Sequence, residues 1–218
     1  SRNPGRMHAC GHDGHTAMLL GAAKYLAETR NFSGAVHLIF QPAEEGGGGA
    51  RAMVADGLFE RFPCDAVYGL HNRPGLEVGR FGIRPGAMMA GCAFFDIRVE
   101  GKGGHGARPE NTVDPVVCGA QIVSALQTVV SRGISMTDNA VVSVGSLQAG
   151  SSANIIPDEA VLQLNVRTFD DRVRDRVLSS IRRVAEGEAA TSGAPRPPEI
   201  VALPGEFPLT VNDEDATR

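Results

Sequence analysis

The sequence predicts an α/β domain that carries an inserted α+β domain, and two observations predict this fold class. In residues 1–89, helical patterns alternate with short apolar runs that end in polar side chains, as in open α/β sheets. In residues 90–203, strand and helix patterns follow one another in the order β-α-β-β-α-β, which is typical of a ferredoxin-like domain. We expect residues 204–218 to begin the return to the first domain.

The first domain is predicted to contain two helices and two buried strands. Apolar residues recur at helical spacing over Thr16–Glu28, and a second helix is expected over Ala50–Phe59. The apolar runs Ala35–Phe40 and Ala66–Leu70 predict buried strands. Because open α/β sheets place their sites at strand ends, the polar residues that follow these runs are candidates for chemistry.

The second domain is predicted to contain four strands and two amphipathic helices. Its first strand alternates Phe95, Ile97 and Val99 with charged residues, so it should be half exposed. We then expect a helix over 113–130, whose apolar side carries Val116, Val117, Ala120, Val123 and Leu126. Strands are expected over Ala140–Gly145 and Val161–Phe169, and in the second of them Leu162, Leu164 and Val166 face inward. A helix capped by Asp170 or Asp171 follows with Val173, Val177, Ile181 and Val184 on its apolar side, and the last strand is expected over Glu199–Leu203.

Composition narrows the functional classes. The 218 residues are 42% hydrophobic and carry a net charge of −4 without a Lys/Arg-rich run, so we expect a folded protein with neither nucleic acid nor membrane as a partner. No apolar stretch is long enough to span a bilayer and no signal-peptide pattern opens the chain, so a cytoplasmic location is expected. The four cysteines have no disulfide-framework spacing and are predicted to be free thiols.

The segment Met7–Thr16 gathers one thiol, three imidazoles and a carboxylate just before the first predicted helix. Cys10 and His12 form a Cys-x-His pair that can offer a soft and a borderline ligand to Zn²⁺ or a similar ion. The alternative is a capped helix start with exposed histidines.

Two further elements carry candidate groups. Glu44 and Glu45 are adjacent carboxylates before four glycines, so one can bind a metal while the other faces the substrate as a general base. His71 follows the second predicted strand and supplies another imidazole. A solvated acidic loop and a structural histidine are the alternative interpretations.

The three segments His-Ala-Cys-Gly-His-Asp, Gln-Pro-Ala-Glu-Glu-Gly and Gly-Leu-His-Asn together resemble the M20 peptidase family. The resemblance is to its amidohydrolase branch, which contains hippurate hydrolases, N-acyl-amino-acid hydrolases and auxin-conjugate hydrolases. It implies that residues 1–89 are part of a phosphorylase/hydrolase-like catalytic domain of the zinc-exopeptidase type. It further implies a site for two divalent metal ions (Mn, Zn or Co), with metal ligands Cys10, His12, Glu45 and His71 and the general base Glu44. Asp13 and His15 are candidates for orienting these ligands.

The resemblance extends to the second domain. The loop Gly101–Pro109 resembles the family's loop whose histidine reaches into an active site, commonly that of the partner subunit, which makes His105 a candidate to polarise the scissile carbonyl. Asn154 and Arg167 match lid positions that hold the substrate, and Arg167 suits a carboxylate. The resemblance thus implies a lid and dimerisation domain, and a homodimer. A mobile loop histidine and an arginine on the exposed side of a strand are the alternatives.

The implied function is metal-dependent hydrolysis of an amide bond in a small-molecule N-acyl amino acid. A dipeptidase or carboxypeptidase of the same family is one alternative, and a non-catalytic binding or dimerisation module is another. Family members carry an Asp-bearing strand before the first segment and a late histidine, and neither occurs in these 218 residues. Since the chain also opens on Ser1 without a methionine, we expect a fragment that by itself retains metal weakly and has no turnover.

Overall fold

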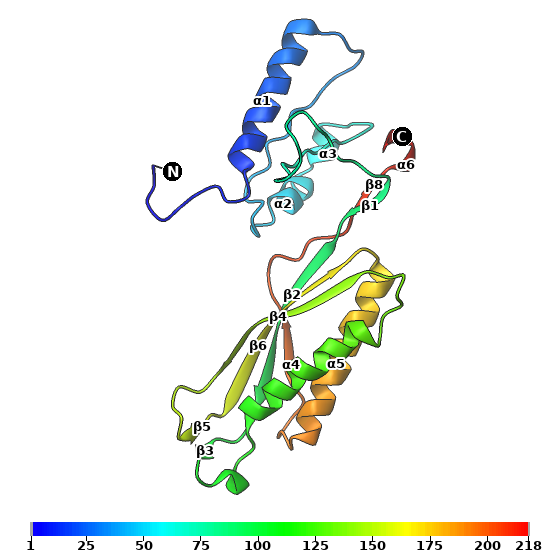
Figure 1. Cartoon of the computed structure of the whole chain (residues 1–218). Helices are drawn as coiled ribbons and strands as arrows, with labels where there is room; N and C mark the ends of the chain where they lie inside the picture. Colours follow the sequence, from blue (N-terminus) through cyan, green and yellow to red (C-terminus); the bar gives the residue numbers. More distant parts are fainter. Residues whose placement is uncertain (1, 218) are drawn as a thin grey trace. The chain divides into compact units, whose positions relative to one another are not determined.

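The computed structural model describes residues 2–217 and divides into two compact units, Ser1–Gly82 (unit 1) and Ile83–Arg218 (unit 2). Figure 1 shows the elements of each unit.

Unit 2 is built on a four-stranded antiparallel sheet. Its strands are β2 (Gly91–Glu100), β4 (Ala140–Ala149), β6 (Glu159–Thr168) and β7 (Glu199–Ala202), arranged in the order β4-β6-β2-β7. The helices α4 (Pro115–Ser131) and α5 (Asp171–Thr191) pack on each other and on one face of this sheet (Figure 1). In chain order these elements run strand, helix, strand, strand, helix, strand, as the sequence predicts.

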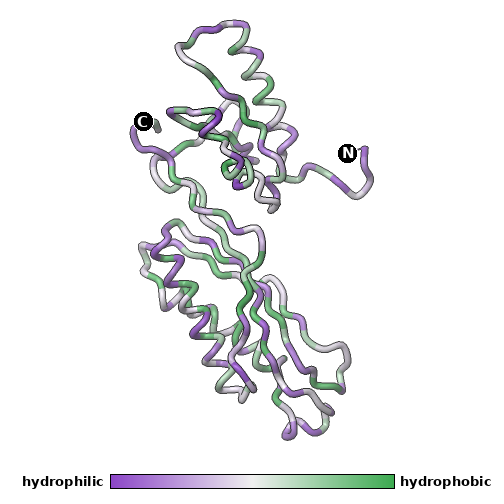
Figure 2. The backbone as a smooth tube through the Cα atoms, turned by 180° about the vertical axis from the view of Figure 1, so that it is seen from behind, coloured by the Kyte–Doolittle hydropathy of each residue, from purple (hydrophilic) through white to green (hydrophobic). Residues whose placement is uncertain are grey.

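The core of unit 2 lies between the sheet and its two helices. Side chains alternate between the core and the opposite face along β6, where Leu162, Leu164 and Val166 are buried as predicted. Figure 2 shows the same alternation of apolar and polar residues along the strands. Helix α5 contributes its predicted apolar stripe, of which Val173 and Ile181 are buried.

Both long helices of unit 2 begin at an aspartate cap. The carboxylate of Asp114 accepts hydrogen bonds from the backbone N–H groups of Val116 (2.8 Å) and Val117 (3.3 Å). Asp170 accepts from Val173 N–H at 3.1 Å, so Asp170 is the N-cap residue of α5 and Asp171 is its first residue. The helix boundaries therefore follow from local chemistry that is visible in the sequence.

Three details of unit 2 differ from the sequence-based expectations. Strand β4 extends to Ala149, because a register shift between Val144 and Ser146 lets pairing with β6 continue. Helix α4 buries Cys118 and Ile122, whereas Val116 and Val117 are exposed, because the buried residues recur at helical spacing from Pro115 onward and these two valines lie on another side of the helix.

Asp96 of β2 is the third difference, since it is buried rather than exposed. Its carboxylate accepts a hydrogen bond from Gln163 Nε2 at 3.3 Å and lies 3.5 Å from the Arg98 guanidinium. These two partners make the burial of a charged group possible.

All four cysteines are free thiols, as predicted. Cys92 and Cys118 are buried in unit 2. Burial raises the pKa of the Cys92 thiol, and the Arg167 charge and a hydrogen bond from Asn165 oppose this effect. Neither buried thiol is placed to act as a reactive group.

Short paired segments complete unit 2. Strand β1 (Gly86–Met89) pairs with β8 (Thr210–Asn212), which is followed by α6 (Glu214–Thr217). Strand β3 (Gly104–His105) pairs with β5 (Ile155–Ile156), and the 3₁₀ helix η1 (Pro109–Asn111) follows β3. The pairing of β8 with β1 joins the last described residues to unit 2.

Unit 1 contains the helices α1 (His12–Thr29), α2 (Gly49–Ala55) and α3 (Leu58–Arg61), and its described residues form no strand. The predicted strands Ala35–Phe40 and Ala66–Leu70 are therefore wrong for this structure. A buried strand needs neighbours that satisfy its backbone groups. Residues 2–82 offer none, and the side chains of both segments are largely exposed.

The helices of unit 1 also differ in their bounds. Helix α1 begins at His12 rather than Thr16, so His12 and His15 lie in its first turn. The predicted helix Ala50–Phe59 is divided into α2 and α3, because Gly57 has φ 82° and ends α2. None of the helices among the described residues is both long and apolar enough to cross a membrane.

Leu162 is the position where we expect a single substitution to destabilise unit 2 most clearly. It is fully buried at the centre of the core, so Leu162→Ala should lower the free energy of unfolding by about 2–5 kcal/mol. Urea unfolding followed by circular dichroism measures this. Leu147→Ala makes the same chemical change where the side chain is 40% exposed, and it should cost less than half as much. Equal losses in both variants would contradict the placement of the core.

Candidate metal centre

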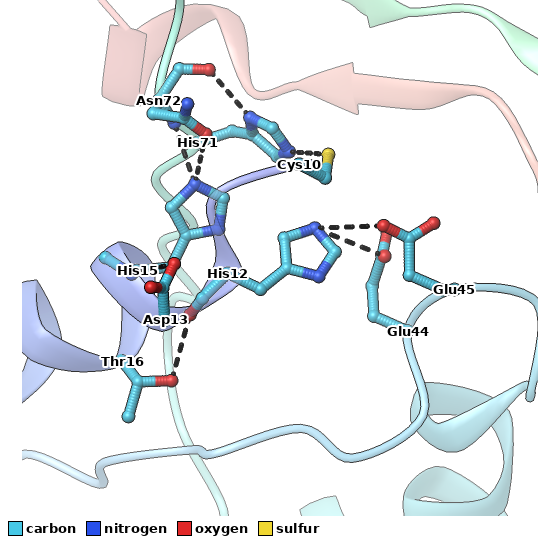
Figure 3. A network of polar contacts seen from close by, with 10 residues as sticks. Cys10, His12, Asp13, His15, Thr16, Glu44, Glu45, His71 and Asn72 are labelled. Carbon is cyan, nitrogen blue, oxygen red and sulfur yellow. Dashed lines mark hydrogen bonds and ion pairs between the residues drawn. The ribbon is translucent and has the colours of Figure 1, made fainter. Parts of the chain in front are cut away.

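Unit 1 brings together candidate metal ligands from three segments that are far apart in sequence (Figure 3). Cys10 lies just before α1 and His12 is its first residue, Glu44 and Glu45 come from the glycine-rich turn before α2, and His71 comes from a later loop. All five residues were singled out from the sequence alone.

The ligand atoms form two groups. Cys10, His12 and His71 form the first, and Cys10 Sγ lies 3.4 Å from His71 Nε2. His12, Glu44 and Glu45 form the second. Within each group all the ligand atoms lie within 4.8 Å of one another. His12 belongs to both groups.

The two carboxylates approach the same imidazole nitrogen. His12 Nε2 lies 3.4 Å from Glu44 Oε2 and 3.8 Å from Glu45 Oε1. The geometry by itself therefore does not separate a metal-binding carboxylate from a general base.

The residues fit a divalent transition metal by two criteria. Thiolate sulfur, imidazole nitrogen and carboxylate oxygen are the donors that Zn²⁺ and Co²⁺ accept. Two atoms bound to one tetrahedral zinc ion at about 2.0–2.3 Å lie about 3.3–3.8 Å apart. The separation of 3.4 Å in the first group and those of 3.4 Å and 3.8 Å in the second lie in this range.

The glycine run shapes the turn that carries the carboxylates. Gly46 N–H donates to Glu44 O at 2.7 Å, and Gly47 N–H donates to Ala43 O at 3.1 Å. Gly49 is the one buried residue among residues 2–82, and an added Cβ there would overlap the carbonyl oxygen of Pro42. The turn closes only because glycine lets two stretches of backbone touch.

Gly49→Ala should therefore displace Glu44 and Glu45 and weaken metal binding. We expect the dissociation constant for Co²⁺ to rise by about 10–100-fold, the range found when supporting residues around a metal are lost. Gly21→Ala is a matched control, because an added Cβ on Gly21 meets no atom within 4 Å. Calorimetric titration of both variants measures the difference. Identical affinities would show that the close approach at Gly49 does not govern the turn.

Asn72 contributes contacts that the sequence did not single out. Its backbone oxygen lies 2.8 Å from His71 Nδ1, and its amide lies against His15. The only available signal was its place directly after His71 in Gly-Leu-His-Asn. Asp13, by contrast, accepts a hydrogen bond from the adjacent Gly14 N–H at 3.0 Å.

The candidate lid residues of unit 2 fall into two places. His105 pairs with Ile155, and Gly106 N–H donates to Asn154 O at 2.8 Å, so the structure brings His105 and Asn154 together. Arg167 lies near the opposite end of β6, where its guanidinium stands 5.7 Å from the Phe207 ring centroid. Since a strand rises about 3.3 Å per residue, the length of β6 separates Arg167 from the other two.

Comparison with known proteins places the chain in a sequence family. Residues 1–215 match the sequence model of a family that is described as Peptidase family M20/M25/M40. A hippurate hydrolase from Campylobacter jejuni is 44% identical over 218 residues, covering 99% of the chain and 55% of that protein. An N-acetylcysteine deacetylase from Bacillus subtilis is 48% identical over 195 residues, covering 89% of the chain and 51% of that protein.

Solved structures share the fold. A structure from methicillin-resistant Staphylococcus aureus, described as that of an aminohydrolase, matches 100% of the chain and 57% of its own, with a TM-score of 0.86 and 38% identity. A dinuclear metal binding peptidase of the M20 family from Bacillus subtilis matches 97% of the chain and 52% of its own, with a TM-score of 0.76 and 40% identity. The chain therefore spans about half the length of the relatives it matches.

Proposed function

Because the chain belongs to the peptidase family M20/M25/M40, we propose that the protein which carries it hydrolyses the amide bond of small N-acyl amino acids in a metal-dependent reaction. The observation that carries this proposal is the convergence of sulfur, nitrogen and oxygen ligand atoms in two groups that share His12. The names of the relatives, a hippurate hydrolase and an N-acetylcysteine deacetylase, support the substrate class.

We assign Cys10, His12, Glu45 and His71 as the ligands of two divalent ions, of which Mn, Zn and Co suit the donor set. Such ions, when bound, lower the pKa of water to about 7 and polarise a carbonyl. The two-ion assignment is supported by the sharing of His12 between the groups and by the dinuclear relative. Residues 1–89 then belong to an α/β catalytic domain.

Glu44 is the general base in this proposal. Its carboxylate takes a proton from the attacking water and later returns it to the leaving amine. The Glu44 side chain is exposed and lies beside His12, so it can turn toward both the attacking water and the leaving amine. The bond broken is the one between the acyl carbon and the amino-acid nitrogen.

His105 is proposed to donate a hydrogen bond to the carbonyl oxygen as negative charge develops there. Ala107 N–H donates to His105 Nδ1 at 3.1 Å, so the neutral ring carries its proton on Nε2. A single donor of this kind contributes about 10²–10³-fold to the rate. The exposure of His105 leaves Nε2 accessible to a substrate.

We propose that residues 90–203 form a ferredoxin-like lid and dimerisation domain, with residues 204–218 beginning the return to the catalytic domain. The order and antiparallel pairing of the strands support the fold. The outer side of β4, a ten-residue edge strand, supports pairing in a homodimer. We also propose a cytoplasmic location, as expected from the sequence.

The positions of Asn154 and Arg167 refine their proposed role as substrate-binding residues. Asn154 and Arg167 lie toward opposite ends of β6, so the two residues of one protomer are too far apart to contact the same small substrate. We infer that His105 and Asn154 serve one active site of the dimer, and Arg167 serves the other.

A substrate panel tests the proposed function. The whole protein that carries the chain is loaded with metal and assayed with hippurate, N-acetylcysteine and unmodified dipeptides, and the released amino acids are quantified by chromatography. We expect hydrolysis of the N-acyl amino acids and its loss after chelation. Hydrolysis of dipeptides alone would favour the dipeptidase or carboxypeptidase alternative. A protein that neither binds metal nor cleaves any substrate would be a binding or dimerisation module.

A further inference from the structure

Asn72 links the two backbone segments that supply the first ligand group. Cys10 and His12 lie on one segment and His71 on the other. Asn72 belongs to neither group, yet its backbone oxygen contacts His71, and its side-chain amide lies against His15 and Gly11. Figure 3 shows it above the imidazoles of His15 and His71.

The first contact fixes the ring of His71. Its Nδ1 lies 2.8 Å from the carbonyl oxygen of Asn72, and a carbonyl oxygen only accepts, so Nδ1 carries the proton. The lone pair of the neutral ring is then on Nε2, the nitrogen that lies 3.4 Å from Cys10 Sγ. Metal-binding histidines usually have such a carbonyl partner for their other nitrogen.

The second contact holds the ring of His15. Asn72 N–H donates to His15 Nε2 at 3.0 Å, and Asn72 Oδ1 lies 2.6 Å from the same nitrogen. A ring nitrogen either donates or accepts, so His15 Nε2 either accepts from Asn72 N–H or donates to Asn72 Oδ1, and either bond holds the imidazole against Asn72. The His15 ring in turn contacts the rings of His71 and His12, with centroid separations of 4.3 Å and 5.2 Å.

The third contact is with Gly11, the residue between the ligands Cys10 and His12. A Cβ added to Gly11 would lie 3.0 Å from Asn72 Nδ2 and 3.1 Å from Oδ1, so the amide lies directly over the glycine. Gly11 also has φ 77°, a conformation that favours glycine. The amide of Asn72 therefore packs on the backbone turn that aims both ligands.

We propose that Asn72 is a positioning residue of the metal centre. It sets the separation between the Cys10–His12 segment and His71 through its amide and the His15 ring. The inference rests on the proposed function, because it presupposes that the cluster binds metal. It assigns to Asn72 no contact with the metal or the substrate.

Cobalt titration of the whole protein that carries this chain tests this role. Cobalt reports both affinity and a thiolate-to-metal absorption band that requires Cys10 as a ligand. Asn72→Ala should weaken binding by about 10–100-fold and diminish this band. Asn72→Asp, which keeps Oδ1 at the same place, should restore most of the affinity and the band. Asn111→Ala, which removes an amide from unit 2, is the matched control and should behave as wild type.

A double-mutant cycle separates positioning from a general loss of packing. If Asn72 acts through His15, the variant with both His15→Ala and Asn72→Ala should bind cobalt no more weakly than the weaker single variant. Thermal unfolding by circular dichroism checks that each variant is folded.

The outcomes distinguish this inference from the proposed function. If wild type takes up no cobalt, the metal centre itself is wrong and the role of Asn72 falls with it. If wild type binds cobalt and Asn72→Ala binds it with the same affinity and the same band, only the role of Asn72 is wrong. Additive losses in the double variant would also overturn the inference.

Discussion

The His12→Ala variant is expected to bind Co²⁺ or Zn²⁺ more weakly than wild type by more than about 100-fold, and to lose both ions together. Among the described residues, His12 is the one residue present in both ligand groups. Loss of a residue that merely supports a metal ligand already costs about 10–100-fold in affinity. Removal of a shared ligand should therefore exceed that range. Metal content after dialysis, measured by mass spectrometry, gives the stoichiometry, and titration gives the affinity.

His8→Ala is the control for this experiment. It removes an imidazole from the same segment, and His8 belongs to neither ligand group. Its metal content should equal that of wild type. If His12→Ala retained one ion at full affinity, the two groups would be independent and the shared role of His12 would be refuted.

The Glu44→Gln variant is expected to lower kcat by about 10²–10⁴-fold, the usual contribution of a general base. Glutamine has nearly the same shape as glutamate but does not take up a proton at neutral pH. Metal content should stay at the wild-type level, because Glu44 is not assigned as a ligand. Hydrolysis of the best substrate in the panel measures the rate.

Glu45→Gln is the matched comparison. It should lose metal, and activity should fall as a consequence. The comparison matters because His12 Nε2 lies nearer to Glu44 (3.4 Å) than to Glu45 (3.8 Å). If Glu44→Gln lost metal and Glu45→Gln kept it, Glu44 would be the metal ligand and Glu45 the general base. A Glu44→Gln variant with full turnover would remove the general base from the proposal.

The elements of unit 2 were predictable because local and long-range signals agree there. Strand β6 alternates apolar and polar residues, and its inward-facing residues are the buried ones. Asp170 precedes an amphipathic helix and caps it. The buried side of α4 was misjudged because apolar residues such as Val116 occur on more than one side of this helix, and only the stripe that contains Cys118 and Ile122 faces the core.

The strands predicted for unit 1 failed for a different reason. Ala35–Phe40 and Ala66–Leu70 have the composition of buried strands, but composition does not supply a hydrogen-bonding neighbour. In the described part of unit 1 these segments have none, and Tyr68 is 82% exposed. Periodicity reports the preference of a segment, whereas a strand also requires a partner.

The ligand residues could be predicted better than the elements that carry them. Cys10, His12, Glu44, Glu45 and His71 lie in short segments whose residue types already indicate metal chemistry, and the structure brings all five together. The contacts of Asn72 could not be predicted, since they depend on a turn at Gly11 that is distant in sequence. The separation of Arg167 from Asn154 likewise depends on strand register.

The burial pattern gives the two units different sources of stability. Unit 2 is stabilised by a hydrophobic core, whereas Gly49 is the one buried residue in the described part of unit 1. With the proposed metal centre, the folded form of unit 1 gains stability by mass action, about 2.7 kcal/mol when free metal is 100 times its dissociation constant. Each further tenfold rise in free metal adds about 1.4 kcal/mol. The folding equilibrium of unit 1 would then follow the free metal concentration of its surroundings.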